Sequence, residues 1–246
     1  MSIPKIIHYC WFGGGAISPE NRKCMESWKK YCPDYKIIEW NDQNFDISTN
    51  RYAQQAYEAN KYAFVSDYVR LAVLYEYGGI YLDTDVELVR PLDELLELPG
   101  FMGFQTNNEV ATGLGFGARK GNSVVQALLR DYDALDFLKA DGSADLTPCP
   151  ERNTRVLQAL GVRKDGTRQS IAEMEIFPAE YFCPMDLYSR ELRVTPKTYS
   201  IHRYAESWKP KPSAVSRILQ RLLKKHYYTW YCPLRGRIEG RLRKRT

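Results

Sequence analysis

The sequence lacks three features that would place it in a special class of protein. No uninterrupted apolar run reaches the length of about eighteen residues that a membrane-spanning helix needs. The start of the chain lacks the apolar core of a secretory signal, because only two aliphatic residues separate Lys5 from His8. The six cysteines form no C-x-x-C pair and no regular framework, which argues against a zinc site and against disulfides. We therefore expect reduced cysteines and a cytoplasmic protein.

The positive charge of the chain is confined to one end. The 246 residues carry a net charge of +5, whereas residues 203–246 contain thirteen Lys or Arg and two Asp or Glu, a net charge of +11. Residues 1–202 therefore carry a net charge of −6. Apolar and basic residues in the tail alternate at helical spacing, as in an amphipathic helix on an anionic membrane surface. The alternative is a helix packed on the folded domain; nucleic acid is not expected, because no reading motif accompanies the basic residues.

Predicted strands and helices alternate along the body of the chain. The predicted strands are Ile6–Trp11, Lys36–Trp40, a strand ending at Asp83, Val86–Val89, Phe101–Gln105 and Leu114–Gly117. The predicted helices are Pro19–Tyr31, those within residues 48–77, Asn122–Leu138 and Thr154–Leu160, and Asp141–Pro150 is predicted to be a long mobile loop. This alternation favours a single α/β sandwich with a mainly parallel sheet covered on both faces.

The triplet Asp83-Thr84-Asp85 follows the apolar run Gly78 to Leu82. On an extended segment, side chains two residues apart point the same way, so the two carboxylates would form a site for a hard divalent cation. Ligands of parallel sheets bind outside the carboxyl ends of the strands, where this triplet falls. By itself such a triplet is more often a solvated turn, and its flanks decide between the two interpretations.

The segment Tyr62–Tyr77 is predicted to be a buried helix that ends at Gly78. Asp67 and Arg70 lie three residues apart in its middle and therefore on one face. Buried charges require a partner, so the two residues either form a structural ion pair or bind a polar ligand. Their position just before the carboxylate triplet favours a ligand site.

The pattern from Ser66 to Asp85 resembles the sugar-nucleotide signature of a known enzyme family. It reads Ser66-Asp67-x-x-Arg70-x-x-x-Leu74-x-x-x-Gly78-Gly79-x-Tyr81-x-Asp83-x-Asp85, as in the DXD-motif glycosyltransferases related to the yeast initiating α-1,6-mannosyltransferase (glycosyltransferase family 32). Bacterial capsular polysaccharide and lipopolysaccharide transferases share this signature. The opening strand from Ile3 to Gly13 and the element His202-x-x-x-x-Ser207-Trp208 are also similar to the family.

The resemblance implies a fold and a set of site residues. Residues 1–208 would form a GT-A-like glycosyltransferase domain, followed by the basic amphipathic tail of residues 209–246. A manganese or magnesium ion would be bound by Asp83, Asp85 and His202. Asp67 and Arg70, together with Asp83 and Asp85, would form the catalytic site around the donor sugar. The remaining donor-binding residues implied by the family are Trp11, Gly13, Asp83, Ser207 and Trp208, although Arg203 and Tyr204 stand where many relatives have a second histidine and an aromatic residue.

The resemblance also implies a reaction and its partners. The donor would be a UDP- or GDP-sugar and the acceptor a glycan or a lipid-linked glycan, in the synthesis of capsular polysaccharide or lipopolysaccharide. The family retains the anomeric configuration, which implies attack from the front side. We expect a cytoplasmic protein that is peripheral on the inner face of the cell membrane, with the tail on the anionic surface.

Two other classes of protein remain open at this point. The run Leu82-Asp83-Thr84-Asp85-Val86 also resembles the nucleophile strand of haloacid-dehalogenase-like phosphatases, but that strand would open the domain and a later acidic motif would follow it. A non-catalytic sugar-nucleotide-binding protein held at a membrane by the tail would tolerate loss of the carboxylates. The intact carboxylates favour the enzyme.

Overall fold

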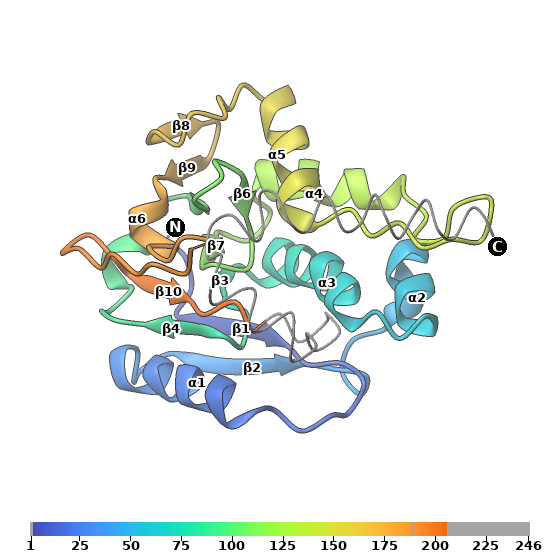
Figure 1. Ribbon diagram of the computed structural model, residues 1–246, viewed down its shortest axis with the longest axis horizontal. Coiled ribbons are helices and arrows are strands. Elements are labelled where there is room, and N and C mark those ends of the chain that lie inside the picture. The colour runs from blue at the N-terminus through green and yellow to red at the C-terminus, as the bar shows by residue number, and fades with distance from the viewer. Residues whose placement is uncertain (1, 188, 206–246) are drawn as a thin grey trace.

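A computed structural model describes residues 2–187 and 189–205 of the chain. Helices cover both faces of an eight-stranded sheet with the order β2-β1-β3-β7-β5-β9-β8, in which β6 pairs with β5 (Figure 1). The strands of this sheet are β1 Ile6–Cys10, β2 Lys36–Trp40, β3 Gly79–Tyr81, β5 Gly100–Phe104, β6 Val110–Ala111, β7 Phe116–Ala118, β8 Gln169–Ile171 and β9 Met174–Phe177. A separate two-stranded sheet pairs β4 (Val86–Leu88) with β10 (Ser200–His202). The predicted α/β sandwich is confirmed.

The strands of the large sheet run mainly, but not all, in one direction. Strands β1, β2 and β3 pair in parallel, and so do β5 and β9. Strand β7 lies antiparallel between β3 and β5, so β1, β2, β3, β5 and β9 all run the same way. Strands β6 and β8 are antiparallel to their partners. The sheet is therefore mixed, with its longest strands running in one direction.

The described residues contain six α-helices. They are α1 Pro19–Tyr31, α2 Arg51–Glu58, α3 Tyr62–Tyr77, α4 Ser123–Asp133, α5 Cys149–Ala159 and α6 Ala179–Phe182. Helix α1 begins at the predicted residue, because the Ser18 hydroxyl caps it and Pro19 fits the first turn. Helix α3 has the predicted bounds and is buried over most of its length. In the described part of the chain, no helix has both the length and the apolar character that crossing a bilayer requires.

Gly78 ends α3, as predicted, and its backbone makes a sharp turn there. Its φ of 66° is positive, but its ψ of −172° lies outside the left-handed helical region that a C-cap glycine usually adopts. Only glycine readily adopts this combination of a positive φ with a ψ near 180°. A Cβ at Gly78 would also lie 2.7 Å from the backbone nitrogen of Lys120. The sharp turn sends the chain from α3 directly into β3 at the centre of the sheet.

Two apolar cores lie on opposite faces of the sheet. The first packs α2, α3, α4 and α5 together and contains Tyr52, Leu71 and Phe137. The second lies under α1, β4 and α6 and contains Trp28 and Phe182. The five cysteines in the described residues are free and buried, as expected from their irregular spacing.

Several predicted boundaries are wrong. The carboxylate triplet is a turn between β3 and β4 rather than an extension of the strand, and β4 belongs to the small sheet. The helix predicted to reach Leu138 ends at Asp133, and α5 begins at Cys149, inside the loop predicted over Asp141–Pro150. That loop is anchored by the ion pair between Asp145 and Arg152. The predicted amphipathic tail lies outside the described residues.

Candidate active site

The turn that carries the carboxylates is held by three hydrogen bonds from different parts of the chain. The Val86 N–H donates to the Asp83 carbonyl at 3.0 Å, which closes the turn. The Asp83 N–H donates to the Gly113 carbonyl at 3.1 Å, and the side-chain amide of Asn21 on α1 donates to the Thr84 hydroxyl at 2.9 Å. These contacts position the two carboxylates more firmly than a solvated loop would.

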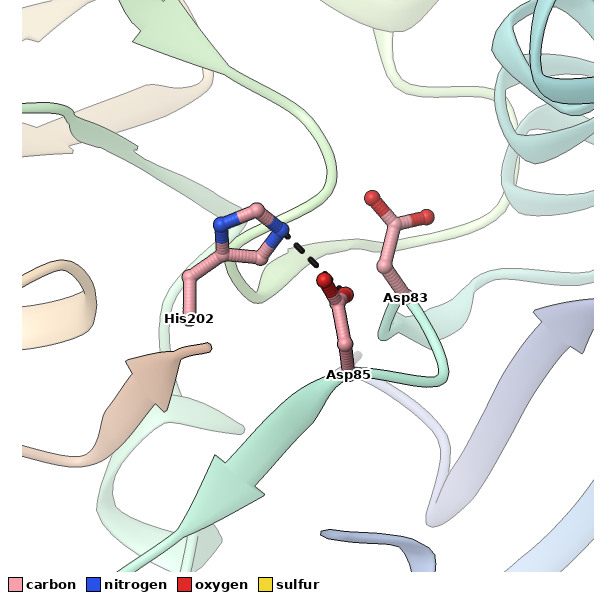
Figure 2. A group of neighbouring side chains, drawn as sticks. All are labelled: Asp83, Asp85 and His202. Carbon is pink, nitrogen blue, oxygen red and sulfur yellow. Dashed lines mark ion pairs between the residues drawn. The ribbon is translucent and has the colours of Figure 1, made fainter. Parts of the chain in front are cut away.

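The three residues expected to bind a metal lie together. One ligand atom from each of Asp83, Asp85 and His202 can be chosen so that all lie within 4.8 Å of one another (Figure 2). His202 comes from β10, whose antiparallel pairing places it opposite Val86, the residue after Asp85. Its Nε2 lies 3.3 Å from Oδ1 of Asp85. Two short strands thus bring together residues that are far apart in the sequence.

Electrostatic effects differ between the members of this cluster. Burial alone would raise the pKa of Asp85, but the adjacent His202 and the backbone N–H of Ala205 outweigh it and lower that pKa to about 2. Burial likewise opposes protonation of His202, yet the Asp85 carboxylate raises the pKa of His202 above its usual value. Burial raises the pKa of Asp83, although Arg70 opposes this effect. Asp85 is therefore the carboxylate that stays ionised over the widest pH range.

The residues of the cluster fit a divalent cation. Two carboxylates suit Mg²⁺ or Mn²⁺, and an imidazole is an acceptable ligand for Mn²⁺. The side chain of Asp83 keeps 28% of its surface exposed, against 12% for Asp85 and 15% for His202. Asp83 is therefore the member of the cluster that faces solvent most, and Asp85 and His202 lie deeper. Such a site leaves room for the oxygens of a phosphate or diphosphate on a bound cation.

The predicted pair of Asp67 and Arg70 is a buried ion pair. Nη2 of Arg70 lies 3.1 Å from Oδ1 of Asp67, and the two side chains are 5% and 11% exposed, Arg70 being the more buried. The same Nη2 lies 3.2 Å from Oδ1 of Asp83. The guanidinium also lies over the ring of Tyr81, 4.9 Å from its centroid, and the Tyr81 hydroxyl donates to Asp83 at 3.0 Å. Arg70 therefore joins the helix pair to the cation cluster, a contact that the sequence did not predict.

Burial affects the carboxyl group of Asp67 strongly. Desolvation raises the pKa of Asp67 to about 6, because the opposing charge of Arg70 is shared with Asp83. This carboxyl group can therefore be protonated under mildly acidic conditions. It differs in this respect from Asp85.

Two residues that contact this site have no signal in the sequence that would have identified them. Gly113 faces Asp83, and a Cβ added to it would overlap Oδ2 of that residue. Cys149 begins α5 and places its Sγ 3.8 Å from Nη1 of Arg70. Burial raises the pKa of the Cys149 thiol, so it is a neutral packing group rather than a nucleophile. A glycine close to other glycines and an irregularly spaced cysteine carry too little information to be singled out.

The expected base-binding residues lie at the carboxyl edge of the same sheet. Trp11 directly follows β1, and Leu82 follows β3 and donates its N–H to the carbonyl of His8 on β1. The half-buried Trp11 donates its indole N–H to the Gly15 carbonyl. Gly13 has a φ of 81°, and a Cβ there would overlap the ring of Tyr62. Ser207 and Trp208, the other donor-binding residues implied by the resemblance, lie outside the described residues.

Comparison with known proteins gives an independent result for this region. Residues 18–101 match the family described as "Glycosyltransferase sugar-binding region containing DXD motif". Inositol phosphoceramide mannosyltransferase 3 of Schizosaccharomyces pombe is 30% identical over 147 residues, which are 55% of this chain and 39% of that protein. Mannosyl phosphorylinositol ceramide synthase SUR1 of Saccharomyces cerevisiae is 33% identical over 111 residues, 41% of this chain and 27% of that protein. The chain thus spans well under two thirds of the length of these relatives.

A third relative is similar over most of its length. An uncharacterized glycosyltransferase of Acanthamoeba polyphaga mimivirus is 26% identical over 221 residues, which are 85% of this chain and 84% of that protein. Asp83-Thr84-Asp85 is the one D-x-D triplet within residues 18–101. Residues 18–101 are therefore similar to a glycosyltransferase sugar-binding region of the DXD type, and the carboxylates of the cation cluster are the D-x-D triplet within that match.

Proposed function

We propose that this protein is a metal-dependent glycosyltransferase that moves a sugar from a UDP- or GDP-sugar to a glycan or lipid-linked acceptor. The observation that carries the proposal is the cluster of Asp83, Asp85 and His202, whose ligand atoms lie within 4.8 Å of one another. Arg70 connects this cluster to Asp67 through ion pairs of 3.1 and 3.2 Å. In this proposal the cation site binds the diphosphate of the donor, and the buried pair of Asp67 and Arg70 lies beside the sugar.

Each group has a role in this proposal. Asp83, Asp85 and His202 hold a Mn²⁺ or Mg²⁺ ion, which when bound neutralises the charge that develops on the departing diphosphate. Arg70 fixes the Asp83 carboxylate, since one guanidinium nitrogen contacts Asp83 and Asp67 together. The Asp67 carboxyl group accepts a hydrogen bond from a hydroxyl of the donor sugar when it is ionised, and can donate one to that hydroxyl when it is protonated. Trp11 stacks on the nucleotide base, and Gly13, where a Cβ would overlap the ring of Tyr62, lets the backbone approach the nucleotide.

The acceptor and the setting of the reaction are further parts of the proposal. We place the enzyme in surface polysaccharide synthesis of the capsular or lipopolysaccharide type, at the inner face of the cell membrane, with retention of the anomeric configuration. The net charge of +11 on residues 203–246 supports contact with an anionic surface. Cosedimentation with phosphatidylglycerol vesicles at low and high salt tests the membrane contact. A protein that stays in the supernatant at low salt contradicts it and leaves the catalytic proposal untouched.

A donor panel tests the proposal directly. Purified protein with Mn²⁺ is mixed with UDP- and GDP-sugars, and the thermal midpoint and the released nucleotide are measured. A ligand that binds only the folded state raises the midpoint, by an amount set by its concentration relative to its Kd. GDP-mannose is tested first, since two relatives are named for mannosyl transfer. We expect one donor to raise the midpoint and to be hydrolysed slowly without acceptor; no shift and no hydrolysis with any donor contradict the proposal.

The same experiment separates the two alternatives. A phosphatase of the haloacid dehalogenase type releases inorganic phosphate from phosphate monoesters, and a binding protein shifts its midpoint without forming product. The contacts of Asp83 do not favour the phosphatase, because Arg70 and the Tyr81 hydroxyl both contact Oδ1 of the carboxylate that would act as nucleophile. Release of a nucleoside diphosphate together with free sugar identifies the transferase.

A further inference from the structure

The four residues from His202 to Ala205 wrap around Asp85. The imidazole of His202 lies 3.3 Å from Oδ1 of that carboxylate, and the Ala205 N–H donates to Oδ2 at 2.7 Å. Between them, the Arg203 N–H donates to the backbone carbonyl of Asp85 at 2.9 Å. Asp85 thus has three contacts from one short segment that follows β10. That arrangement requires a particular bend of the chain between residues 202 and 205.

Tyr204 supplies that bend. Its φ of 51° is positive, which is uncommon for a residue with a side chain and costs energy that the surroundings must repay. The bend turns the Ala205 N–H toward Oδ2 of Asp85, whereas the Arg203 N–H, which donates to the backbone carbonyl of Asp85, continues the pairing of β10 with β4.

The side chain of Tyr204 contacts the proposed metal ligand His202. The two rings meet edge to face, with centroids 4.3 Å apart and planes at 85°. The tyrosine ring is buried, and its hydroxyl lies 2.9 Å from Sγ of Cys183. The guanidinium of Arg190, on the segment after α6, lies 4.7 Å from the centroid of the tyrosine ring. The ring is therefore fixed from two sides. Its position limits the directions in which the imidazole can turn.

This contact replaces the usual support of a metal-binding histidine. Such a histidine commonly donates its second ring N–H to a carboxylate or carbonyl, which orients the ring. Among residues 2–187 and 189–205, Nδ1 of His202 is buried and has no hydrogen-bond partner. Within the described residues no polar group therefore orients the ring through Nδ1, and the ring is held by Asp85 at Nε2 and by packing against Tyr204.

We propose that Tyr204 is a positioning residue for the cation site, acting through its backbone on Asp85 and through its ring on His202. The inference rests on the proposed function, since it concerns the cation that Asp83, Asp85 and His202 would bind. Tyr204 itself does not contact the cation in this account. It determines how well two of the three ligands are held in place before the cation arrives, and its loss weakens cation binding.

Three substitutions separate the ring from the backbone. Tyr204→Phe keeps both, and we expect its Mn²⁺ affinity to stay within about threefold of the wild type, because the hydroxyl only touches Cys183. Tyr204→Gly keeps the backbone conformation without strain but removes the ring, and we expect an affinity about tenfold lower. Tyr204→Ile disfavours the positive φ as well, so we expect the largest loss, up to about a hundredfold.

The measurement is the binding of Mn²⁺ to the protein without donor, followed by the loss of the free Mn²⁺ signal in electron paramagnetic resonance. Thermal unfolding of each variant without metal verifies that it is folded. If Tyr204→Gly does not fold, Tyr204→Asn replaces it, because asparagine tolerates positive φ and lacks the ring. The expected order of affinity is wild type close to Phe, then Gly or Asn, then Ile.

Two results overturn the inference. One is a wild-type Mn²⁺ affinity in folded variants that lack the ring, and the other is a loss in Tyr204→Phe as large as in Tyr204→Gly. Failure of the wild type to bind Mn²⁺ at all is a different result, because it contradicts the proposed cation site and not the role of Tyr204 alone. The KM for Mn²⁺ gives a second readout: a positioning role raises it while kcat at saturating Mn²⁺ changes less.

Discussion

Two buried pairs in this site, Asp67 with Arg70 and Asp85 with His202, are brought together in different ways. Asp67 and Arg70 are three residues apart on α3, so a single helical turn brings them together. Asp85 and His202 meet because β4 and β10 pair in a small sheet that joins distant parts of the chain. The first contact is local and survives small shifts of the fold. The second depends on the whole domain being assembled.

The same two carboxylates differ in charge. Burial would raise the pKa of both, and it raises the pKa of Asp67 to about 6 because Arg70 is shared with Asp83. Asp85 escapes this effect, since His202 and the Ala205 N–H lower its pKa to about 2. Asp85 is therefore prepared to face a metal cation as an anion. Asp67 is prepared to exchange hydrogen bonds with a neutral group such as a sugar hydroxyl, as the proposed function requires.

The largest expected effect comes from removing the guanidinium of Arg70, which contacts both Asp67 and Asp83. Arg70→Ala leaves Asp67 and Asp83 without their guanidinium partner, and Asp67 is buried. We expect a loss of about 3–5 kcal/mol in the free energy of unfolding, as for other buried pairs from which one partner is removed. Urea unfolding measures this loss, and donor hydrolysis should fall with it.

A matched arginine provides the control for that experiment. Arg51 forms an exposed pair with Asp136, and Arg51→Ala should cost no more than about 1 kcal/mol. Equal effects of Arg70→Ala and Arg51→Ala would show that burial of the Asp67 pair has no energetic consequence.

The next largest effect should appear on the cation side. Asp85→Asn removes the carboxylate that stays ionised, and we expect turnover to fall about a hundredfold or more while the domain remains folded. Steady-state hydrolysis of the donor at saturating Mn²⁺ measures the change. Asp34→Asn, which alters an exposed carboxylate paired with Lys5, serves as the control and should leave turnover unchanged. Near wild-type turnover in Asp85→Asn would show that the turn does not bind an essential metal.

The charge difference between the two carboxylates predicts a dependence on pH. The pKa of Asp67 is about 6 in the folded protein and 3.8 in the unfolded chain. Its contribution to stability is therefore fully present below pH 3.8 and is lost as the pH rises through about 6. Asp67→Asn lacks this contribution, so the stability difference from wild type should be larger at pH 4.5 than at pH 7.5, by about 1–3 kcal/mol. Urea unfolding of both proteins at the two pH values tests this, and a difference independent of pH would contradict the assignment.

The smallest expected effect concerns the glycine that faces Asp83. Gly113→Ala places a methyl group where Oδ2 of Asp83 lies, so the carboxylate must move. We expect Mn²⁺ affinity to fall about tenfold, in the range typical for displaced support of a metal ligand. Gly100→Ala is the matched control, because it crowds Met174 on the same sheet away from the carboxylates. Equal Mn²⁺ affinities of the two variants would show that Asp83 tolerates displacement.

The contrast between the two regions also explains what the sequence could predict of the site. The ion pair on α3 follows from the spacing of Asp67 and Arg70 and from the apolar residues around them. His202 was expected only through resemblance to a family, since nothing local connects it to Asp85. The contact of Arg70 with Asp83 was missed because it requires knowledge of how α3 packs against β3, and that of Gly113 with the same carboxylate was missed because it requires the pairing of β3 with β7.

The fold shows the same division between local and distant information. Helix α1 begins at its predicted residue because Ser18 and Pro19 mark it within the sequence. The small sheet of β4 and β10 was not predicted, since three-residue strands carry little periodicity and the two strands lie far apart in the sequence. The strand predicted to end at Asp83 ends at Tyr81, and a turn replaces the extended segment expected at Asp83-Thr84-Asp85. Long, periodic segments were therefore predictable, and the short elements that complete the site were not.

The central claim is that Asp83, Asp85 and His202 bind one divalent cation that the reaction requires. Titration of the protein with Mn²⁺, followed by electron paramagnetic resonance with and without UDP or GDP, tests it most directly. We predict one Mn²⁺ per chain in the wild type, tighter binding in the presence of the preferred nucleotide, and no such binding in Asp85→Asn. The account is contradicted if wild type and Asp85→Asn bind Mn²⁺ alike, or if the wild type hydrolyses its donor at the same rate in EDTA as in Mn²⁺.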